Sequence, residues 1–290
     1  MATMILVVWY MNSFMGGRMI VDQANTCSVT PLLVIDCVSK RFTNPKGGAS
    51  ILALDDISFD VFDREYVCIL GRSGCGKSTL LGVIAGFIIP DSGRVLCKGQ
   101  AIEGPDRHRM LMFQESALFP WLDVLGNVLY SLNLVEGITK SEKLERAMMF
   151  LEMVGLADFH HLRIHELSGG MKQRTALARA LAPDPDILLM DEPFSALDAM
   201  TREQFYCDMQ RIWNETHKTI IMVTHNVREA VCLGTRVVVM ETLGQLVADE
   251  TVALPFPRGM NDVSLTAAAA QISNLVRIGS NNGAANGVRT

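Results

Sequence analysis

Short continuous apolar runs recur along the chain and are separated by amphipathic stretches. The apolar runs predict buried strands at 66–70, 109–113, 187–190, 219–223 and 236–240. Amphipathic stretches at about 199–216 and 226–233 predict helices between the last three of these strands. Strands that are apolar throughout and alternate with helices are typical of a parallel sheet covered on both faces. The pattern therefore predicts an α/β fold.

The N-terminal part of the chain predicts a lead-in followed by short strands. Residues 1–31 are expected to form a poorly ordered lead-in. Its first residues are apolar, but no positively charged region precedes them, so a signal peptide is not expected. Translation that starts at Met4, Met11, Met15 or Met19 is a hypothesis that N-terminal sequencing of the native protein would test. Further strands are predicted at 32–38, 57–61 and 94–97, with a loop at 43–50.

A helical period dominates from about residue 115 to residue 182. Thr139 and Glu142 have the spacing of a capping box at a helix N-terminus. Leu144, Met148 and Leu151 then follow at the i, i+4, i+7 spacing of one helix face. We interpret this segment as a helical insertion between two strands of the sheet.

The C-terminal part predicts a short Ala-rich helix from Ser264 and then an Asn/Gly-rich tail. We expect one domain over 32–258 and a flexible tail over 259–290. No run approaches the roughly 18–20 apolar residues that a membrane helix needs. Any link to a membrane is therefore expected to come through a partner.

Composition narrows the classes of function. The 290 residues suffice for one large domain or two closely joined ones, and the net charge of -5 leaves no basic footprint for nucleic acid. The seven cysteines are odd in number, scattered, and form no C-x-x-C pair. A reduced, cytosolic protein without a disulfide framework or zinc site is the interpretation that follows.

A phosphate-binding loop is predicted between the apolar strand at 66–70 and an apolar helix that follows. The stretch fits G-x-x-x-x-G-K-[ST], in which glycines let the backbone amides surround a phosphate at a helix N-terminus. Lys77 would neutralise charge on the β- and γ-phosphates, and Ser78 would offer its hydroxyl to Mg²⁺. Cys75 is expected to be a reactive thiol, because a helix N-terminus lowers the pKa of a cysteine. The predicted loop comprises Gly71, Arg72, Ser73, Gly74, Cys75, Gly76, Lys77, Ser78 and Thr79.

Two carboxylates end the apolar strand at 187–190. Strands often end in acidic residues at a solvated edge, so Asp191 and Glu192 alone would carry little weight. Next to a phosphate loop, however, Asp191 could hold Mg²⁺ and Glu192 could take a proton from an attacking water.

The stretch L-S-G-G-M-K-Q-R at 167–174 decides the class of protein. Ser168 could simply cap a helix, or the amides of Ser168, Gly169 and Gly170 could face a γ-phosphate. The stretch resembles the signature of ATP-binding cassette (ABC) ATPases, and the resemblance covers about residues 32–258. It implies a P-loop NTPase (RecA-like) parallel-sheet core, an antiparallel β subdomain and a helical signature subdomain at about 115–182.

The resemblance also assigns roles to residues that mean little alone. Gln114 is similar to the Q-loop glutamine that touches Mg²⁺ and water, and 195–198 looks like the D-loop at the dimer interface. His225 resembles the switch histidine that contacts the γ-phosphate. Phe42 sits where the family stacks an aromatic ring on adenine. A lone Gln, His or Phe is more often an ordinary polar or core residue, and it is the order of the motifs that supports these roles.

One segment resembles a subfamily of importers. The sequence F-P-W-L at 119–122 is similar to a segment of importers for nitrate, sulfonates and taurine. It could anchor a cytoplasmic helix of a permease, or Phe119 and Trp121 could merely be core residues. Arg64 stands where such proteins usually have Gly in a turn, and Asn226 stands where Asp usually follows the switch histidine.

The function expected from the sequence is the ATP-binding and ATP-hydrolysing subunit of an ABC importer, with ATP and Mg²⁺ as cofactors. The resemblance implies a homodimer in which Ser168 and Gly170 of one chain face the ATP of the other. It also implies a membrane permease, a periplasmic or extracellular solute-binding protein, and a peripheral place at the cytoplasmic face of the inner membrane. The alternatives are a soluble ABC ATPase of DNA repair or translation and a non-hydrolysing regulatory module.

Overall fold

The computed structural model describes residues 30–43, 50–241 and 244–286, with side chains described as far as residue 276. Apart from Thr30, all of these residues belong to one compact unit, Pro31–Thr290. The lead-in predicted for 1–31 and most of the loop predicted for 43–50 lie outside the described residues.

The main sheet has six strands in the order β10-β9-β3-β8-β7-β6. Five neighbouring strands, β9, β3, β8, β7 and β6, are parallel, and β10 pairs antiparallel with β9 at the edge. The predicted parallel sheet is confirmed, whereas the antiparallel strand β10 was not predicted. The strands are β3 (Tyr66–Gly71), β6 (Arg109–Met112), β7 (Ile187–Asp191), β8 (Thr219–Thr224), β9 (Arg236–Glu241) and β10 (Gln245–Thr251).

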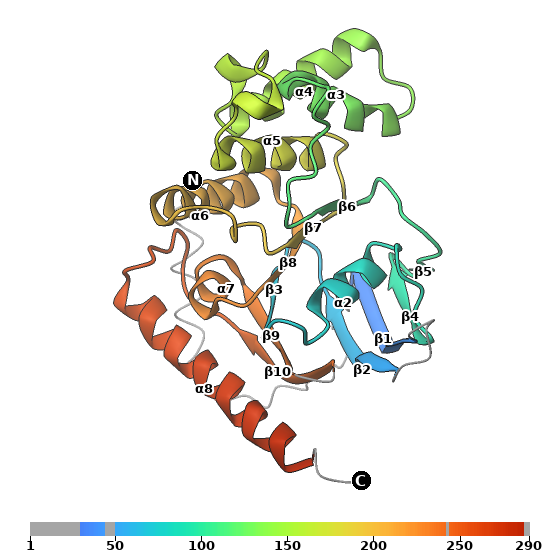
Figure 1. Cartoon of the computed structure of the whole chain (residues 1–290), viewed down its shortest axis with the longest axis vertical. Helices are drawn as coiled ribbons and strands as arrows, with labels where there is room; N and C mark the ends of the chain where they lie inside the picture. Colours follow the sequence, from blue (N-terminus) through green and yellow to red (C-terminus); the bar gives the residue numbers. More distant parts are fainter. Residues whose placement is uncertain (1–29, 44–49, 242–243, 287–290) are drawn as a thin grey trace, which may run out of the picture. The chain divides into compact units, whose positions relative to one another are not determined.

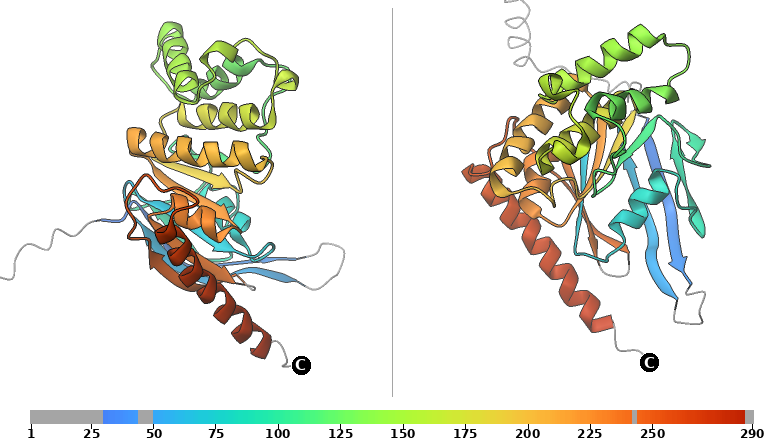
Figure 2. Two further views of the ribbon diagram at one scale, coloured as in Figure 1. Left: turned by 90° about the vertical axis from the view of Figure 1, so that its left-hand side faces the viewer. Right: turned by 45° about the horizontal axis from the view of Figure 1, so that its top comes forward.

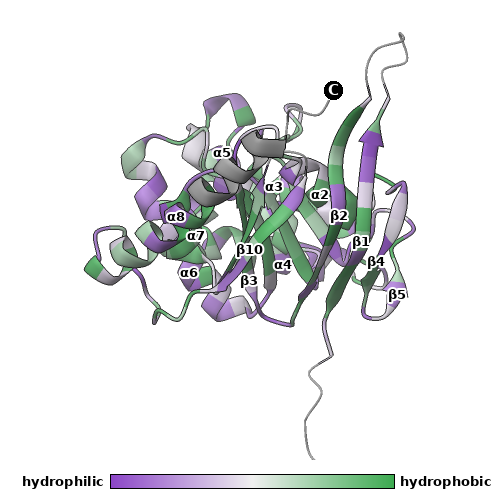
Figure 3. Ribbon diagram, turned by 90° about the horizontal axis from the view of Figure 1, so that it is seen from below, coloured by the Kyte–Doolittle hydropathy of each residue, from purple (hydrophilic) through white to green (hydrophobic). Residues whose placement is uncertain are grey.

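Both faces of the main sheet are buried, because alternate side chains of its central strands enter two different cores. Tyr66, Cys68 and Leu70 of β3 join a core with the helices that follow β6. Val67 and Ile69 point the other way, into a second core shared with the small sheet. This two-sided burial explains the continuous apolar runs, which are coloured mostly hydrophobic in Figure 3.

A second, antiparallel sheet has the order β2-β1-β4-β5. Leu33, Ile35 and Val38 of its first strand are buried in the core that this sheet shares with α2. The antiparallel β subdomain implied by the family resemblance is therefore present. Its strands are β1 (Leu33–Phe42), β2 (Ile51–Val61), β4 (Ser92–Cys97) and β5 (Gln100–Ala101).

Helices α3, α4 and α5 follow one another between β6 and β7 and form a layer at one end of the molecule (Figures 1 and 2). Thr139 caps α4, and its side chain and that of Glu142 bond each other's backbone amides as the predicted capping box. The helices of the unit before residue 240 are α2 (Lys77–Ile84), α3 (Val124–Ser131), α4 (Lys140–Met153), α5 (Gly169–Leu181), α6 (Ala199–Thr216) and α7 (Val227–Leu233). None of the helices in the described part of the chain is long and apolar enough to cross a membrane.

The turn before β3 explains one departure from the family pattern. Arg64 has φ 63°, in the left-handed region where glycine is the usual residue. Its backbone amide donates to the Thr219 hydroxyl at 2.8 Å, which ties the turn to the first residue of β8. The departure therefore keeps the turn geometry and changes only the residue that adopts it.

The C-terminal part corrects the prediction of a short helix and a mobile tail. Helix α8 spans Val263–Asn286 and lies along α7, β9 and β10 (Figure 1). Leu265, Ala269 and Ile272 are buried in the main core, so the first half of α8 is packed on the domain. The apolar residues that make this contact are spaced along one helix face, a pattern hidden by the Ala-rich composition.

A buried arginine fastens the segment that leads to α8. Arg258 is 4% exposed, and its guanidinium donates to the carbonyls of Val231, Gly234, Val252 and Leu254. Burial lowers the pKa of Arg258. Four carbonyls, two at the end of α7 and just after it and two in the segment after β10, therefore converge on one cation, which fixes the path of the chain before α8.

We predict that Leu265→Ala lowers the free energy of unfolding by about 2–5 kcal/mol, because it opens a cavity under α8. Val263→Ala on the same helix is the matched control, since Val263 is 85% exposed and should change stability by less than about 0.5 kcal/mol. Urea denaturation followed by circular dichroism measures both. Equal, small effects would show that α8 does not pack on the domain.

Candidate functional site

The phosphate loop joins β3 to α2. Gly74 and Gly76 have φ 83° and 104°, and a Cβ added at Gly76 would lie 2.2 Å from the carbonyl oxygen of Ala53. Only glycine therefore fits at position 76. Gly76 caps α2 without a side-chain hydrogen bond, so the first amides of the helix have no side-chain acceptor there. Such an N-terminus is built to receive an anion.

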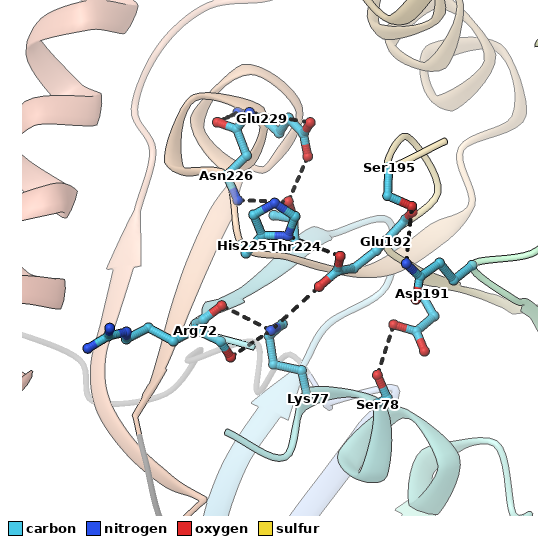
Figure 4. Close-up of polar contacts among 12 residues, drawn as sticks. Arg72, Lys77, Ser78, Asp191, Glu192, Ser195, Thr224, His225, Asn226 and Glu229 are labelled. Carbon is cyan, nitrogen blue, oxygen red and sulfur yellow. Dashed lines mark hydrogen bonds and ion pairs between the residues drawn. The ribbon is translucent and has the colours of Figure 1, made fainter. Parts of the chain in front are cut away.

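Lys77 is turned back into this loop. It is 5% exposed, and its Nζ donates to the carbonyls of Gly71 at 2.9 Å and Arg72 at 3.0 Å. The same Nζ lies 3.7 Å from Glu192 Oε1, so the loop lysine and the second strand-end carboxylate form an ion pair. Figure 4 shows these contacts at the centre of the site. The loop thus presents its cation where the strand-end acids converge.

Ser78 and Asp191 form a pair of oxygen ligands beside the loop. The Ser78 hydroxyl donates to Asp191 Oδ1 at 3.1 Å. Burial raises the pKa of Asp191, and the Ser78 hydrogen bond opposes that effect. One hydroxyl and one carboxylate fit the way in which proteins hold Mg²⁺, which takes one or two carboxylates, water and substrate phosphates as ligands. The residues present therefore fit a magnesium ion bound together with a phosphate group.

Glu192 follows β7 directly and connects the loop to the switch histidine. Its φ of 41° is a strained value for a residue with a side chain. In this conformation one carboxylate oxygen faces Lys77, and the other lies 3.0 Å from His225 Nδ1 (Figure 4). Because β7 and β8 are parallel neighbours, Glu192 and His225 emerge side by side at the same edge of the sheet.

Gln114 reaches the site through a serine. Its Nε2 donates to Ser195 Oγ at 3.3 Å, and that hydroxyl donates to the Glu192 carbonyl at 3.0 Å. Gln173 of α5 donates to the Gln114 carbonyl at 3.2 Å, which links the helical insertion to the same loop. Sequence reasoning placed Gln114 and Ser195 in separate motifs and gave Gln173 no role; the structure joins all three.

The signature residues stand apart from the phosphate loop of their own chain. Ser168 caps α5, and its hydroxyl accepts from the Met171 amide at 3.2 Å. A Cβ added at Gly170 would lie 2.6 Å from Thr201 Cγ2, so α5 packs closely on the start of α6. Among the described residues, no hydrogen bond or ion pair joins 168–170 to 71–79, and Figures 1 and 2 show α5 and α2 in different layers.

Phe42 is the last residue of β1 and is 43% exposed. Lys40 Nζ lies 5.7 Å from the centre of its ring, which leaves the ring an accessible aromatic surface at the rim of the small sheet. The structure shows no contact between Phe42 and the phosphate loop in the part of the chain it describes. Its role with adenine stays a prediction.

A buried network that sequence reasoning missed lies behind His225. The carboxylate of Glu229 accepts hydrogen bonds from Tyr206 at 2.7 Å and Thr224 at 2.6 Å. Thr224 is part of the switch motif, but Tyr206 is distant in sequence and nothing local marks it. The only local signal is that Glu229 is an acidic residue on the apolar side of a short helix.

The expectation of a reactive Cys75 thiol is wrong. Cys75 is 1% exposed, and burial raises its pKa, with the charge of Lys77 as a weaker opposing effect. The sequence shows the helix N-terminus next to the thiol, but it does not show that the side chain points into the core beneath the loop. Desolvation of the thiolate therefore outweighs the helix N-terminus.

An apolar groove of about 390 Å³ lies between the edge of the main sheet and the helical insertion. Phe87, Phe113, Phe119, Tyr130 and Leu134 line it together with Arg107, Arg109 and Arg179. Phe119 is half-buried and stacks near Tyr130, while Trp121 is 68% exposed. In the segment at 119–122, Phe119 therefore lines the groove and Trp121 lies at the surface, so Trp121 is not a core residue.

Fold and site together define a phosphate-loop ATPase with a helical insertion between β6 and β7. The family model described as "ABC transporter" matches residues 54–195. The taurine import ATP-binding protein TauB of Roseobacter denitrificans is 48% identical over 208 residues, which cover 72% of this chain and 77% of that protein. The nitrate import ATP-binding protein NrtD of Synechococcus elongatus is 41% identical over 230 residues, which cover 79% of this chain and 83% of that protein.

A solved structure agrees with these relatives. The dimeric post-hydrolysis state of the ATP-binding cassette MJ0796, bound to ADP and Pi, superposes with a TM-score of 0.68 at 31% identity. The superposed region covers 77% of this chain and all of the MJ0796 chain. The chain belongs to the ABC transporter family of ATP-hydrolysing cassettes, within the group of importer ATP-binding subunits.

We predict that N-ethylmaleimide alkylates Cys207, which is exposed, well before Cys75 in the folded protein at neutral pH. Cys75 should react slowly, because it is buried and burial raises the pKa of its thiol, whereas Cys207 is exposed to the reagent. Peptide mapping by mass spectrometry at a series of times measures each site, and unfolding in guanidinium should remove the difference. Cys75 reacting as fast as Cys207 in the folded protein would contradict this account.

Proposed function

We propose that this chain is the ATP-binding and ATP-hydrolysing subunit of an importer that takes up a small anion through a separate membrane permease. The observation that carries the proposal is the Glu192 carboxylate, which bridges Lys77 of the phosphate loop and His225 of the switch. A carboxylate held beside a phosphate loop is the arrangement that hydrolysis requires, and mere binding does not require it.

ATP is held by the phosphate loop. The backbone amides at the start of α2 and the Lys77 ammonium bind the phosphates, and Phe42 stacks on adenine. Ser78, Asp191 and Gln114 would hold Mg²⁺, which neutralises phosphate charge when it is bound. The 3.1 Å contact between Ser78 and Asp191 supports this choice, because their oxygens already converge on one point.

Hydrolysis is assigned to the residues at the strand ends. Glu192 accepts a proton from the attacking water, and His225, which lies 3.0 Å from Glu192, contacts the γ-phosphate. Gln114, whose side chain is held by its contact with Ser195, orients the water. The strained backbone of Glu192 supports this role, since such strain persists where the surroundings fix a functional group.

The complete site spans two chains. The capped N-terminus of α5, with Ser168, Gly169 and Gly170, presents phosphate-binding amides away from the phosphate loop of its own chain. In a head-to-tail homodimer this N-terminus would face the ATP of the partner subunit. The dimeric structure of MJ0796 supports the same assembly.

The apolar groove is the proposed docking site for the permease. An amphipathic helix from a permease fits a groove of this size and lining. Phe113 lines the groove and directly precedes Gln114, so a helix bound in the groove could move Gln114 and thereby affect the hydrolytic site. This contact would hold the chain at the cytoplasmic face of the inner membrane.

The transported anion is proposed from the relatives. Taurine and nitrate are both small anionic or zwitterionic solutes, and the two import proteins are 48% and 41% identical to this chain over most of their length. We propose a nitrate, sulfonate or taurine substrate, delivered by a solute-binding protein outside the membrane. The soluble DNA-repair and translation alternatives are not favoured, because the relatives named above are import subunits.

We predict that Glu192→Gln lowers ATP turnover by roughly 10²-fold or more, because the amide keeps the size of the side chain but cannot accept the proton. ATP binding should remain, so the variant should run as a dimer with Mg-ATP and as a monomer without it. Size-exclusion chromatography with light scattering measures the mass. A non-hydrolysing regulatory module would instead show no turnover in the wild-type protein either.

Adding Ser168→Arg to that variant separates binding from assembly. The bulky side chain blocks the N-terminus of α5, while Lys77 and the phosphate loop are unchanged. The double variant should therefore still bind ATP through its own Lys77 and stay monomeric. A double variant that still dimerises with Mg-ATP would show that α5 does not face the partner's nucleotide.

For the permease, we predict that Leu134→Glu weakens binding to detergent-solubilised permease by at least about tenfold, because it places a charge in the apolar groove. Met149→Glu is the matched control: Met149 is a similarly exposed apolar residue of the helical insertion outside the groove. Both variants should keep the ATP turnover of the free subunit. Equal loss of permease binding in both variants, or in neither, would place the permease elsewhere.

A further inference from the structure

Behind the switch histidine lies a carboxylate that the proposed hydrolysis does not use. Glu229 of α7 is 7% exposed, and no lysine, arginine or histidine in the described part of the chain forms an ion pair with it. A buried carboxylate without a cation is costly unless hydrogen bonds compensate. Glu229 has three donors: Tyr206 at 2.7 Å, Thr224 at 2.6 Å and Asn226 Nδ2 at 3.4 Å.

Two of these donors flank the switch histidine. Thr224 is the last residue of β8, and Asn226 is the N-cap of α7. The Asn226 amide donates to the Thr224 hydroxyl at 3.0 Å, and the Asn226 side chain accepts from the amides of Arg228 and Glu229. The residues on both sides of His225 are thus fixed to Glu229 and to each other, as Figure 4 shows. The departure at Asn226 keeps the helix cap and adds a donor to Glu229.

The third donor comes from a distant element. Tyr206 lies on α6, the helix that begins one residue after Asp198 of the D-loop segment and packs against the signature helix at Thr201. Burial raises the pKa of Tyr206, so its hydroxyl stays protonated and donates. The Glu229 carboxylate therefore joins α6 to the strand and helix that carry His225.

We propose that Glu229, held by Tyr206, is a positioning residue that directs the ring of His225 toward Glu192. The bonds to Thr224 and Asn226 fix the backbone on both sides of position 225, and the ring then meets Glu192 Oε2 at 3.0 Å. Loss of a bond to Glu229 loosens that backbone without removing any group that touches the nucleotide. The inference rests on the proposed role of His225 in ATP hydrolysis.

Tyr206→Phe tests the inference with the smallest change to the structure, because it deletes one hydroxyl and keeps the ring. Removal of Glu229 itself could unfold α7. We expect kcat for ATP to fall roughly tenfold with KM within about twofold of wild type. Tyr66→Phe is the matched control: Tyr66 is fully buried in the same core, and the hydrogen bond that its hydroxyl makes among the described residues goes to the sulfur of Met222, at 3.7 Å. Its kcat should stay within about twofold of wild type.

A readout independent of turnover is the nitrogen NMR signal of the His225 ring, assigned from its absence in His225→Ala. The signal should shift in Tyr206→Phe and stay in place in Tyr66→Phe. Wild-type kcat together with an unshifted His225 signal in Tyr206→Phe would overturn the inference. So would equal effects of Tyr206→Phe and Tyr66→Phe, because that would mark a general effect on the core.

The double variant Tyr206→Phe/His225→Ala separates positioning from packing. If Tyr206 acts through His225, its loss should cost less than about twofold once His225 is absent, measured in single-turnover reactions with labelled ATP. The same tenfold loss in both backgrounds would overturn the inference while the proposed function stands. If His225→Ala alone keeps wild-type turnover, the proposed role of His225 fails, and the role of Glu229 fails with it.

Discussion

The parallel register of β3, β7 and β8 is the constraint on which the site depends. In such a sheet the carboxyl ends of neighbouring strands meet at one edge, where ligands of open α/β sheets bind. Here that edge holds the phosphate loop after β3, Asp191 and Glu192 at the end of β7, and His225 after β8. The strands are buried on both faces, so their ends cannot shift independently, and the charged groups are presented at fixed separations.

The same rigidity explains why Glu192 can bridge a lysine and a histidine. Its backbone is held at positive φ by the bond from its amide to the Val223 carbonyl, a contact between adjacent strands. Lys77 and His225 approach from the two other strands of the edge. The helical insertion is attached to this edge through Gln114 and Gln173, and the N-terminus of its helix α5 is capped by Ser168. The proposed composite site follows from this separation, because the phosphate loop and the N-terminus of α5 do not meet within one chain in the described residues.

The sequence could predict what local rules determine. The glycines of the phosphate loop, the capping box at Thr139 and the apolar strands follow from short-range patterns, and the structure has all of them. The order of the motifs, which resembles that of the family, was enough to predict that Gln114, Glu192 and His225 lie near one another. What failed depended on burial, which no short pattern encodes.

Two examples show why. The pKa of Cys75 depends on whether the side chain points toward solvent or into the core, and the direction became known only with the packing of the small sheet on α2. The docking of α8 depends on the surface offered by α7 and β9, which lie against α8 in the fold but are separated from it in sequence by β10 and the segment that contains Arg258. Tyr206 and Glu229 likewise meet only because α6 and α7 lie side by side.

The central claim is that the hydrolytic site is completed by a second chain, and the dependence of wild-type ATP turnover on protein concentration tests it most directly. A composite site predicts that turnover per chain falls as the protein is diluted below its dimerisation constant and reaches a plateau at high concentration. The rate should rise with the square of the concentration in the dilute limit. Turnover per chain that stays constant down to the lowest measurable concentration would contradict the account.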